Sequence, residues 1–259
     1  MMRVWTFVTF VFMMGLQAAQ EAAQAQSGSL PVCPTASKSL GSDPLLRTAF
    51  KAAYPSAVLP PETRKPKFDE PCLYPFQAIL YESAVVLITL DRVPGETCHG
   101  CPARLSAVFL RRDRSGLTPV AHHDGFTESG TWGIVSAITP IRLGRDDGIV
   151  VQGGGGFQGE SYSVIDPFIF RDGRAKLLGP QSGIPLEQSN CGAKVDGEPC
   201  RNVSGIWRAE PGGRLVISYQ GNREDKSEVN GVVIYERRGD ALVLTSGNRI
   251  AAEMDENRP

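Results

Sequence analysis

The chain lacks the features of several large classes of protein. Its 27 Lys and Arg residues are balanced by 28 Asp and Glu residues, and no basic cluster exceeds a few residues. Without an excess of positive charge there is little long-range attraction to nucleic acid or anionic lipid, so nucleic-acid binding is not expected. Residues 4–16 form the one long apolar run, which is shorter than the about 20 residues that span a membrane.

Sequence signatures of familiar hydrolases are also missing. The chain contains no G-x-S-x-G, H-E-x-x-H or S-x-x-K motif. His122, His123 and Asp124 could supply a general base, but adjacent strand residues point to opposite faces, so at most one His faces a given pocket. A polar strand that runs into an Asp-Gly turn explains the same residues. The sequence therefore favours a protein without catalytic activity and indicates no cofactor.

Residues 1–25 have the composition of a secretory signal peptide. Arg3 is the one early charge, residues 4–16 form the apolar core, and Ala23-Gln24-Ala25 fits a cleavage site flanked by small residues. An uncleaved membrane anchor is the weaker alternative, because the apolar run is short. We therefore expect a secreted or periplasmic protein that is not inserted in a membrane after signal cleavage.

All six cysteines follow the predicted cleavage site. An even number of cysteines behind a signal peptide is typical of disulfides formed in an oxidising compartment. Their order along the chain suggests three local pairs, although other pairings are possible. The expected pairs are Cys33 with Cys72, Cys98 with Cys101, and Cys191 with Cys200.

The segment Cys98-His99-Gly100-Cys101-Pro102 supports an alternative function. Pro102 stands where a c-type haem site needs a histidine, so haem is rejected. A thioredoxin-like site needs a helix after the first Cys, and structural zinc needs a second close pair of ligands; neither is indicated by the sequence. A thiol-redox or zinc-binding protein centred on Cys98 and Cys101 stays the alternative hypothesis, and no metal ligands are assigned.

The mature chain is expected to have two parts. Residues 26–75 should form an N-terminal arm, one short helix and a Pro-rich connector. The helix is predicted to begin with Asp43 as its N-cap and Pro44 as its first residue, and to end by Tyr54, because Pro55 disfavours helical geometry before it. Residues 76–259 should form an all-β, mainly antiparallel domain, because short Val-, Ile- and Phe-rich runs alternate there with Gly, Asp and Asn.

Three stretches of the β domain resemble one another. Each has a strand, a longer loop, a second strand, a tight turn and a third strand, beginning near residues 84, 148 and 214. We interpret them as three possible internal repeats, although any antiparallel meander with Asp-Gly turns looks self-similar. A propeller-like or sandwich arrangement of these meanders is predicted, with a closed barrel as the alternative.

The most unusual composition lies between residues 152 and 162, QGGGGFQGESY. A phosphate-binding loop is excluded, because Glu160 replaces the required Lys and a strand follows instead of a helix. The glycines could permit a bulge or a close backbone approach. Alternatively, they form a permissive loop that presents Phe157, Gln158, Glu160 and Tyr162 to a ligand.

An apolar ring beside amide and carboxylate groups suits a carbohydrate or a peptide or protein partner. The leading hypothesis is therefore a secreted or periplasmic non-catalytic binding protein that contacts its ligand through long β-loops. A hydrolase with an unrecognised acid–base pair is a third, weaker hypothesis.

Overall fold

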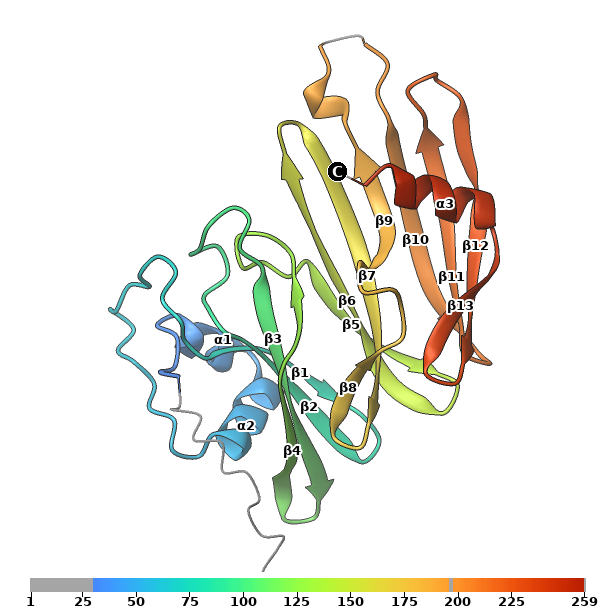
Figure 1. The fold of residues 1–259 in the computed structure, drawn as a ribbon. Coiled ribbons are helices and arrows are strands. Elements are labelled where there is room, and N and C mark those ends of the chain that lie inside the picture. Colours follow the sequence, from blue (N-terminus) through green and yellow to red (C-terminus); the bar gives the residue numbers. More distant parts are fainter. Residues whose placement is uncertain (1–29, 196–197, 259) are drawn as a thin grey trace, which may run out of the picture. The chain divides into compact units, whose positions relative to one another are not determined.

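Two antiparallel β-sheets and three α-helices make up residues 30–195 and 198–258, the part of the chain that the computed structural model describes (Figure 1). The predicted signal peptide, residues 1–25, lies outside the described residues. The helices are α1 (Ala36–Ser42), α2 (Pro44–Ala53) and α3 (Asn248–Glu256), and Cys191–Ala193 forms a short 3-10 helix, η1. The strands are β1 (Tyr74–Leu80), β2 (Ala84–Leu90), β3 (Ala103–Asp113), β4 (Gly116–Ser129), β5 (Ala137–Leu143), β6 (Asp146–Phe157), β7 (Glu160–Arg171), β8 (Arg174–Leu177), β9 (Ile184–Ser189), β10 (Asn202–Glu210), β11 (Arg214–Asn222), β12 (Glu228–Arg238) and β13 (Ala241–Ser246).

The first sheet contains β1 to β4 in sequence order. Its strand β2 reads AVVLITL and is buried from Val85 to Leu90, because both of its faces are covered. Val85 and Leu87 face α1 and α2, where they pack with Phe50, whereas Val86 faces the second sheet. Figure 1 shows α1 and α2 on the outer face of this sheet.

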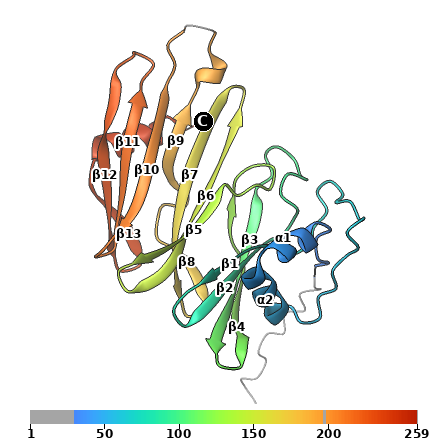
Figure 2. The same cartoon turned by 180° about the vertical axis from the view of Figure 1, so that it is seen from behind.

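The second sheet has nine strands in the order β13-β12-β11-β10-β9-β7-β6-β5, with β8 also paired to β7. Every pairing between these strands is antiparallel. One face of the sheet carries Ile165, Ile217 and Val233, which pack with Ala251 and Met254 of α3. The C-terminal helix therefore covers part of this face, in front of the sheet in Figure 1 and behind it in Figure 2.

The two sheets pack against each other through a shared apolar core. Ile88 and Leu105 of the four-stranded sheet meet Ile149, Val151 and Phe168 of the nine-stranded sheet. The arrangement is a partial sandwich with helices on both outer faces, which confirms the predicted all-β, antiparallel class. Within the described residues the sheets close into neither a propeller nor a barrel, so the propeller-like arrangement was a wrong expectation. The strands form long continuous sheets instead of separate radial blades.

The predicted N-terminal helix is present as α2. The Asp43 carboxylate accepts a hydrogen bond of 3.0 Å from the Leu46 backbone N–H, Pro44 is the first helical residue, and Tyr54 is the C-cap. Helices α1 and α3 were not predicted. Neither has a side-chain cap, and α3 begins after Gly247, so the usual start signals are missing.

The three predicted disulfides are all present. Cys33–Cys72 joins the chain before α1 to the start of β1, and Cys98–Cys101 closes a tight loop between β2 and β3. Cys191–Cys200 pins the excursion between β9 and β10. The three similar stretches correspond to the meanders β2-β3-β4, β6-β7-β8 and β11-β12-β13. Their interpretation as internal repeats stays a prediction.

None of the helices in the described ranges has the length and apolar composition needed to cross a membrane.

Candidate functional site

The glycine-rich segment is a strand and not the loop that the sequence suggested. Gly153 to Gly156 continue β6 and pair with residues 161–164 of β7. The connection is a tight turn at Gln158 and Gly159, both with positive φ (51° and 86°). Such turns match the twist of a β-hairpin and favour glycine at the second position.

Two of the glycines allow the sheets to approach closely at this end. A Cβ atom at Gly153 would lie 2.1 Å from Ser129 Oγ, and one at Gly155 would lie 2.6 Å from Thr131 Cγ2. Any side chain at these positions would push the end of β4 and the following residues away from β6. The glycines therefore serve a close backbone approach, one of the two interpretations drawn from the sequence.

That approach places the Cys98–Cys101 loop beside the β6–β7 hairpin. Trp132 has a left-handed backbone (φ 55°), which is uncommon for a bulky residue. Backbone hydrogen bonds hold it there: the N–H of Trp132 donates to His99 O (3.3 Å), and the N–H of Gly133 donates to Cys101 O (2.8 Å). The disulfide loop thus fixes where the Trp132 side chain points.

Three aromatic rings meet at this point and form what we call the aromatic cluster: His99, Trp132 and Phe157. The His99 ring stands edge-on to Trp132 at 5.4 Å between centroids, and it lies 6.0 Å from the Phe157 ring. Phe157 is 66% exposed and Trp132 41% exposed. Exposed aromatic rings held by a disulfide loop and a strained backbone form a candidate binding surface.

The four predicted ligand residues lie in four different places. Phe157 joins the aromatic cluster, and Gln158 is exposed at the tip of the hairpin. Glu160 lines a polar pocket, and the half-buried Tyr162 lines a second pocket on the opposite face of β7. Trp132 was not among the residues predicted from the sequence. Its one local signal was an aromatic residue between two turn glycines, Gly130 and Gly133.

The polar pocket, which we call the Arg–Glu pocket, has a volume of about 660 Å³. It opens between the β6–β7 hairpin, the disulfide-pinned excursion and the β11–β12 hairpin, whose tips lie at the same end of the sheet (Figure 1). The three segments touch in succession: Gly159 packs on Gly192, and Lys194 Nζ lies 3.3 Å from Glu224 Oε1. The pocket is lined by Glu160, Ser161, Gln188, Ser189, Asn190, Arg201, Arg223, Glu224, Asp225, Glu253, Asn257 and Arg258.

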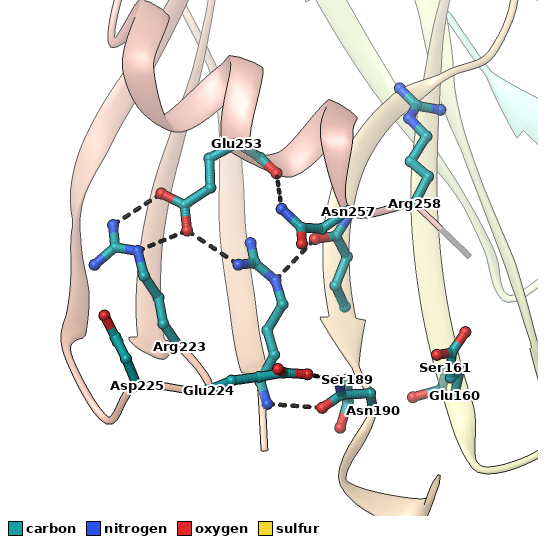
Figure 3. Close-up of a pocket in the computed structure, with 12 residues that line it drawn as sticks. Glu160, Ser161, Ser189, Asn190, Arg223, Glu224, Asp225, Glu253, Asn257 and Arg258 are labelled. Carbon is teal, nitrogen blue, oxygen red and sulfur yellow. Dashed lines mark hydrogen bonds and ion pairs between the residues drawn. The ribbon is translucent and has the colours of Figure 1, made fainter. Parts of the chain in front are cut away.

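Glu253 of α3 is the centre of this pocket (Figure 3). Arg223 donates to both of its carboxylate oxygens at 2.8 Å, and Arg201 Nη1 donates to Oε1 at 3.0 Å. These two guanidinium groups hold the pKa of the Glu253 carboxyl below its usual value. Hydrogen bonds from Asn190 and Ser227 likewise lower the pKa of Glu224 and Asp225.

The pocket therefore presents ionised carboxyl groups and guanidinium groups for polar contact. A general acid at neutral pH needs a carboxyl whose pKa is raised, whereas these three carboxyls shift downward. Arg201 is 8% exposed, and its side chain also donates to Gln188 Oε1. The sequence contained no signal for this network, because Arg201 and Glu253 lie far apart along the chain.

The histidines considered as a general base have structural contacts. His123 Nδ1 accepts a 3.1 Å hydrogen bond from the Ala175 N–H and thereby links β4 to β8. Burial, followed by nearby Arg174, lowers the pKa of His123. The His122 ring lies edge-on to Tyr54 of α2, 6.1 Å away. The two histidines thus face opposite sides of β4, as their adjacent positions predicted.

The Cys98–Cys101 loop has neither of the contexts that the alternative function requires. The two cysteines are bonded to each other, and the strand β3 follows them where a thioredoxin-like site has a helix. Among residues 30–195 and 198–258, no group of three or more His, Cys, Asp or Glu side chains is placed to hold a metal ion.

Comparison of the chain with protein-family models, with curated proteins and with solved structures finds no match.

Proposed function

We propose that the protein is a secreted or periplasmic, non-catalytic binding protein whose ligand is a carbohydrate. The observation that carries the proposal is the aromatic cluster, in which Trp132 and Phe157 are exposed and held in place. Sugar rings stack their C–H faces on aromatic rings and use their hydroxyls for hydrogen bonds. Gln158 and Glu160 supply polar groups next to the cluster, at the tip of the same hairpin.

An extended peptide fits this surface less well. Beyond Gln152, β5 no longer pairs with β6, so the glycine segment could in principle accept an added strand. Residues 129–131 cover that edge, with Thr131 Oγ1 donating to Gly154 O at 3.4 Å. Because the backbone groups are covered, side-chain stacking is the more accessible mode of contact.

Location outside the cytoplasm is supported by the three disulfides, which persist in oxidising compartments.

The test is binding of the purified protein to an array of immobilised oligosaccharides. The unmodified protein should bind a subset of them, and the triple variant Phe157→Ala/Gln158→Ala/Glu160→Ala should bind them much more weakly. Val120→Ala is the matched control, because Val120 is 56% exposed near the other end of β4. Equal binding by the triple variant, or binding to immobilised peptides alone, contradicts the proposal.

The alternative, a thiol-redox or zinc-binding protein at Cys98 and Cys101, has a separate test. Thiol counting and elemental analysis of protein exported by its own host should find no free thiol and no stoichiometric zinc. Free Cys98 and Cys101 thiols or bound zinc would replace the binding proposal with this alternative.

A further inference from the structure

A second pocket lies between the two sheets, next to the aromatic cluster. It has a volume of about 370 Å³ and opens under the end of β4. Glu128, Ser129 and Gly130 line one side, and Tyr162, Val164 and Asp166 of β7 line the other. The remaining lining residues are Pro102, Gly154, Gln181, Ser182 and Arg258. We call it the inter-sheet pocket.

Two buried polar atoms of residues that line this pocket have no hydrogen-bond partner within residues 30–195 and 198–258. Asp166 is 8% exposed and Ser129 is 6% exposed, yet Asp166 Oδ1 and Ser129 Oγ make no hydrogen bond. A buried polar group without a partner costs roughly 1–3 kcal/mol, and more when it is charged, so native proteins seldom retain one without a reason. Burial raises the pKa of the Asp166 carboxyl to about 6, and nearby Arg258 opposes this shift. The pocket therefore holds an acceptor and a hydroxyl that lack counterparts.

The charges of the pocket favour a neutral ligand. Arg258 is already engaged: it donates to Gly183 O at 2.7 Å, to Ser182 O, and to Asp255 Oδ1 at 2.6 Å. It therefore has little capacity left to hold an anion, and the Asp166 carboxylate disfavours one. A cation would meet the positive charge of Arg258 close to Asp166. A ligand with several uncharged hydroxyl groups satisfies both orphan atoms without either conflict.

The pocket lies close to the aromatic cluster along the chain, because its lining residue Gly130 is two residues before Trp132 and its lining residue Gly154 is three residues before Phe157. A Cβ atom at Gly155 would lie 2.6 Å from Thr131 Cγ2 and 3.4 Å from Tyr162 Cε1, so Thr131 separates Tyr162 from the adjacent Trp132. A chain of sugar units could therefore stack on Trp132 and place one unit beside Tyr162. The volume of the inter-sheet pocket lies at the small end of the range for ligand pockets, about 300 to 1,000 Å³, and suits one sugar ring.

We infer that the inter-sheet pocket binds one neutral sugar ring, with the Asp166 carboxylate accepting a hydroxyl hydrogen bond, the Ser129 hydroxyl pairing with a second hydroxyl once its side chain rotates toward the ring, and Tyr162 against the ring. The inference rests on the proposed carbohydrate function and assigns the residues that would recognise a single sugar unit.

The experiment is titration of the purified protein with glucose, galactose, mannose and N-acetylglucosamine, followed by calorimetry or ligand-observed NMR. At least one sugar should bind. Asp166→Asn should weaken that binding about 10- to 100-fold, the range expected for loss of a hydrogen bond to a charged group. Ser129→Ala should weaken it less, because a neutral partner is removed. Asp124→Asn is the matched control, since Asp124 is an exposed carboxylate on β4.

The outcomes separate this inference from the proposed function. Weaker oligosaccharide binding by the Phe157 triple variant, together with unchanged binding by a folded Asp166→Asn variant, overturns the inter-sheet site but leaves the proposed function. Monosaccharide binding that is weakened by Asp166→Asn, but not by the Phe157 triple variant, keeps the inter-sheet site and overturns the role of the aromatic cluster in the proposed function. Binding of ethanolamine in place of the four sugars would overturn the assignment to a neutral ligand. Thermal unfolding of each variant shows whether it is folded.

Discussion

The ring of His99 stands edge-on to the ring of Trp132, with 5.4 Å between their centroids. His99 lies in the connection between β2 and β3, Trp132 lies in the segment that links β4 to β5 of the other sheet, and both contact each other beside the β6–β7 hairpin. The contact depends on the Cys98–Cys101 disulfide, because the backbone of the disulfide loop accepts hydrogen bonds from Trp132 and Gly133. A surface site is thus built where the two sheets converge.

Trp132→Gly should separate binding from stability. Glycine adopts a left-handed backbone without the strain of about 1–2 kcal/mol that a larger residue carries there. Relief of this strain offsets part of the packing energy that is lost with the Trp132 ring. We expect the free energy of unfolding to change by less than about 1 kcal/mol, whereas sugar binding is lost. Urea unfolding and the oligosaccharide array measure the two effects.

Trp207→Gly is the comparison, because Trp207 lies in the interior of β10 and packs against the core under α3. The Trp207→Gly substitution should lower the free energy of unfolding by about 3 kcal/mol or more. A Trp132→Gly variant as unstable as Trp207→Gly would show that Trp132 serves the fold and is not held for ligand contact.

Gly153→Ala should destabilise the protein although alanine is a small residue. Its Cβ would lie 2.1 Å from Ser129 Oγ and 2.7 Å from the backbone nitrogen of Gly130, so the end of β4 must move. Overpacking of this kind costs about 1–3 kcal/mol. Gly41→Ala, in an exposed part of α1 with open space around it, should instead stabilise by about 0.5–1 kcal/mol. Similar effects of the two substitutions on thermal unfolding would contradict the close approach.

Glu253→Gln should weaken the attachment of α3. The change leaves the guanidinium of Arg201, which is 8% exposed, without its carboxylate partner and removes the paired contact to Arg223. Breaking a buried ion pair on one side costs about 3 kcal/mol or more. Glu256→Gln, at an exposed position of the same helix, should change the free energy of unfolding by less than about 0.5 kcal/mol. Chemical denaturation of both variants at neutral pH tests the difference, and equal stability would show that the pair is not important.

The ionisation of Asp166 should contribute to the pH dependence of the free energy of unfolding. Burial raises the pKa of its carboxyl in the folded protein to about 6, against an unfolded value of about 3.9. Because the folded state then binds the proton more tightly, this residue contributes a loss of stability as pH rises from about 4 to 6, on the order of 3 kcal/mol in total. Glu253, with its lowered pKa, contributes in the opposite direction, losing stability as pH falls.

The measurement is urea unfolding of the unmodified protein and of Asp166→Asn across that range. Asparagine does not ionise, so the variant should gain stability relative to the unmodified protein as pH rises, and the difference should be constant above about pH 7. Parallel profiles would show that Asp166 is not an ionisable group held in an unfavourable site.

Local chemistry was predictable from the sequence, and long-range contacts were not. Asp43 and Pro44 predict the start of α2, and each disulfide joins a cysteine to the next cysteine along the chain. The glycine segment was mistaken for a loop because glycine is a poor strand residue. Only the approach of Ser129, which lies in another sheet, explains it.

The residues of the candidate site were likewise predictable from local sequence only in part. Phe157 and Glu160 were selected from the hairpin composition, whereas Trp132 and Glu253 reach the site through tertiary packing alone. Asp166 gave no signal either, since its distinctive property is burial without a partner.

The most direct test of the account is the binding of oligosaccharides by the unmodified protein and by the Phe157→Ala/Gln158→Ala/Glu160→Ala variant in one array experiment. The unmodified protein and the Val120→Ala control should bind the same oligosaccharides, and the triple variant should lose most of this binding while its thermal unfolding is unchanged. Undiminished binding by the triple variant, or no oligosaccharide binding by the unmodified protein, would contradict it.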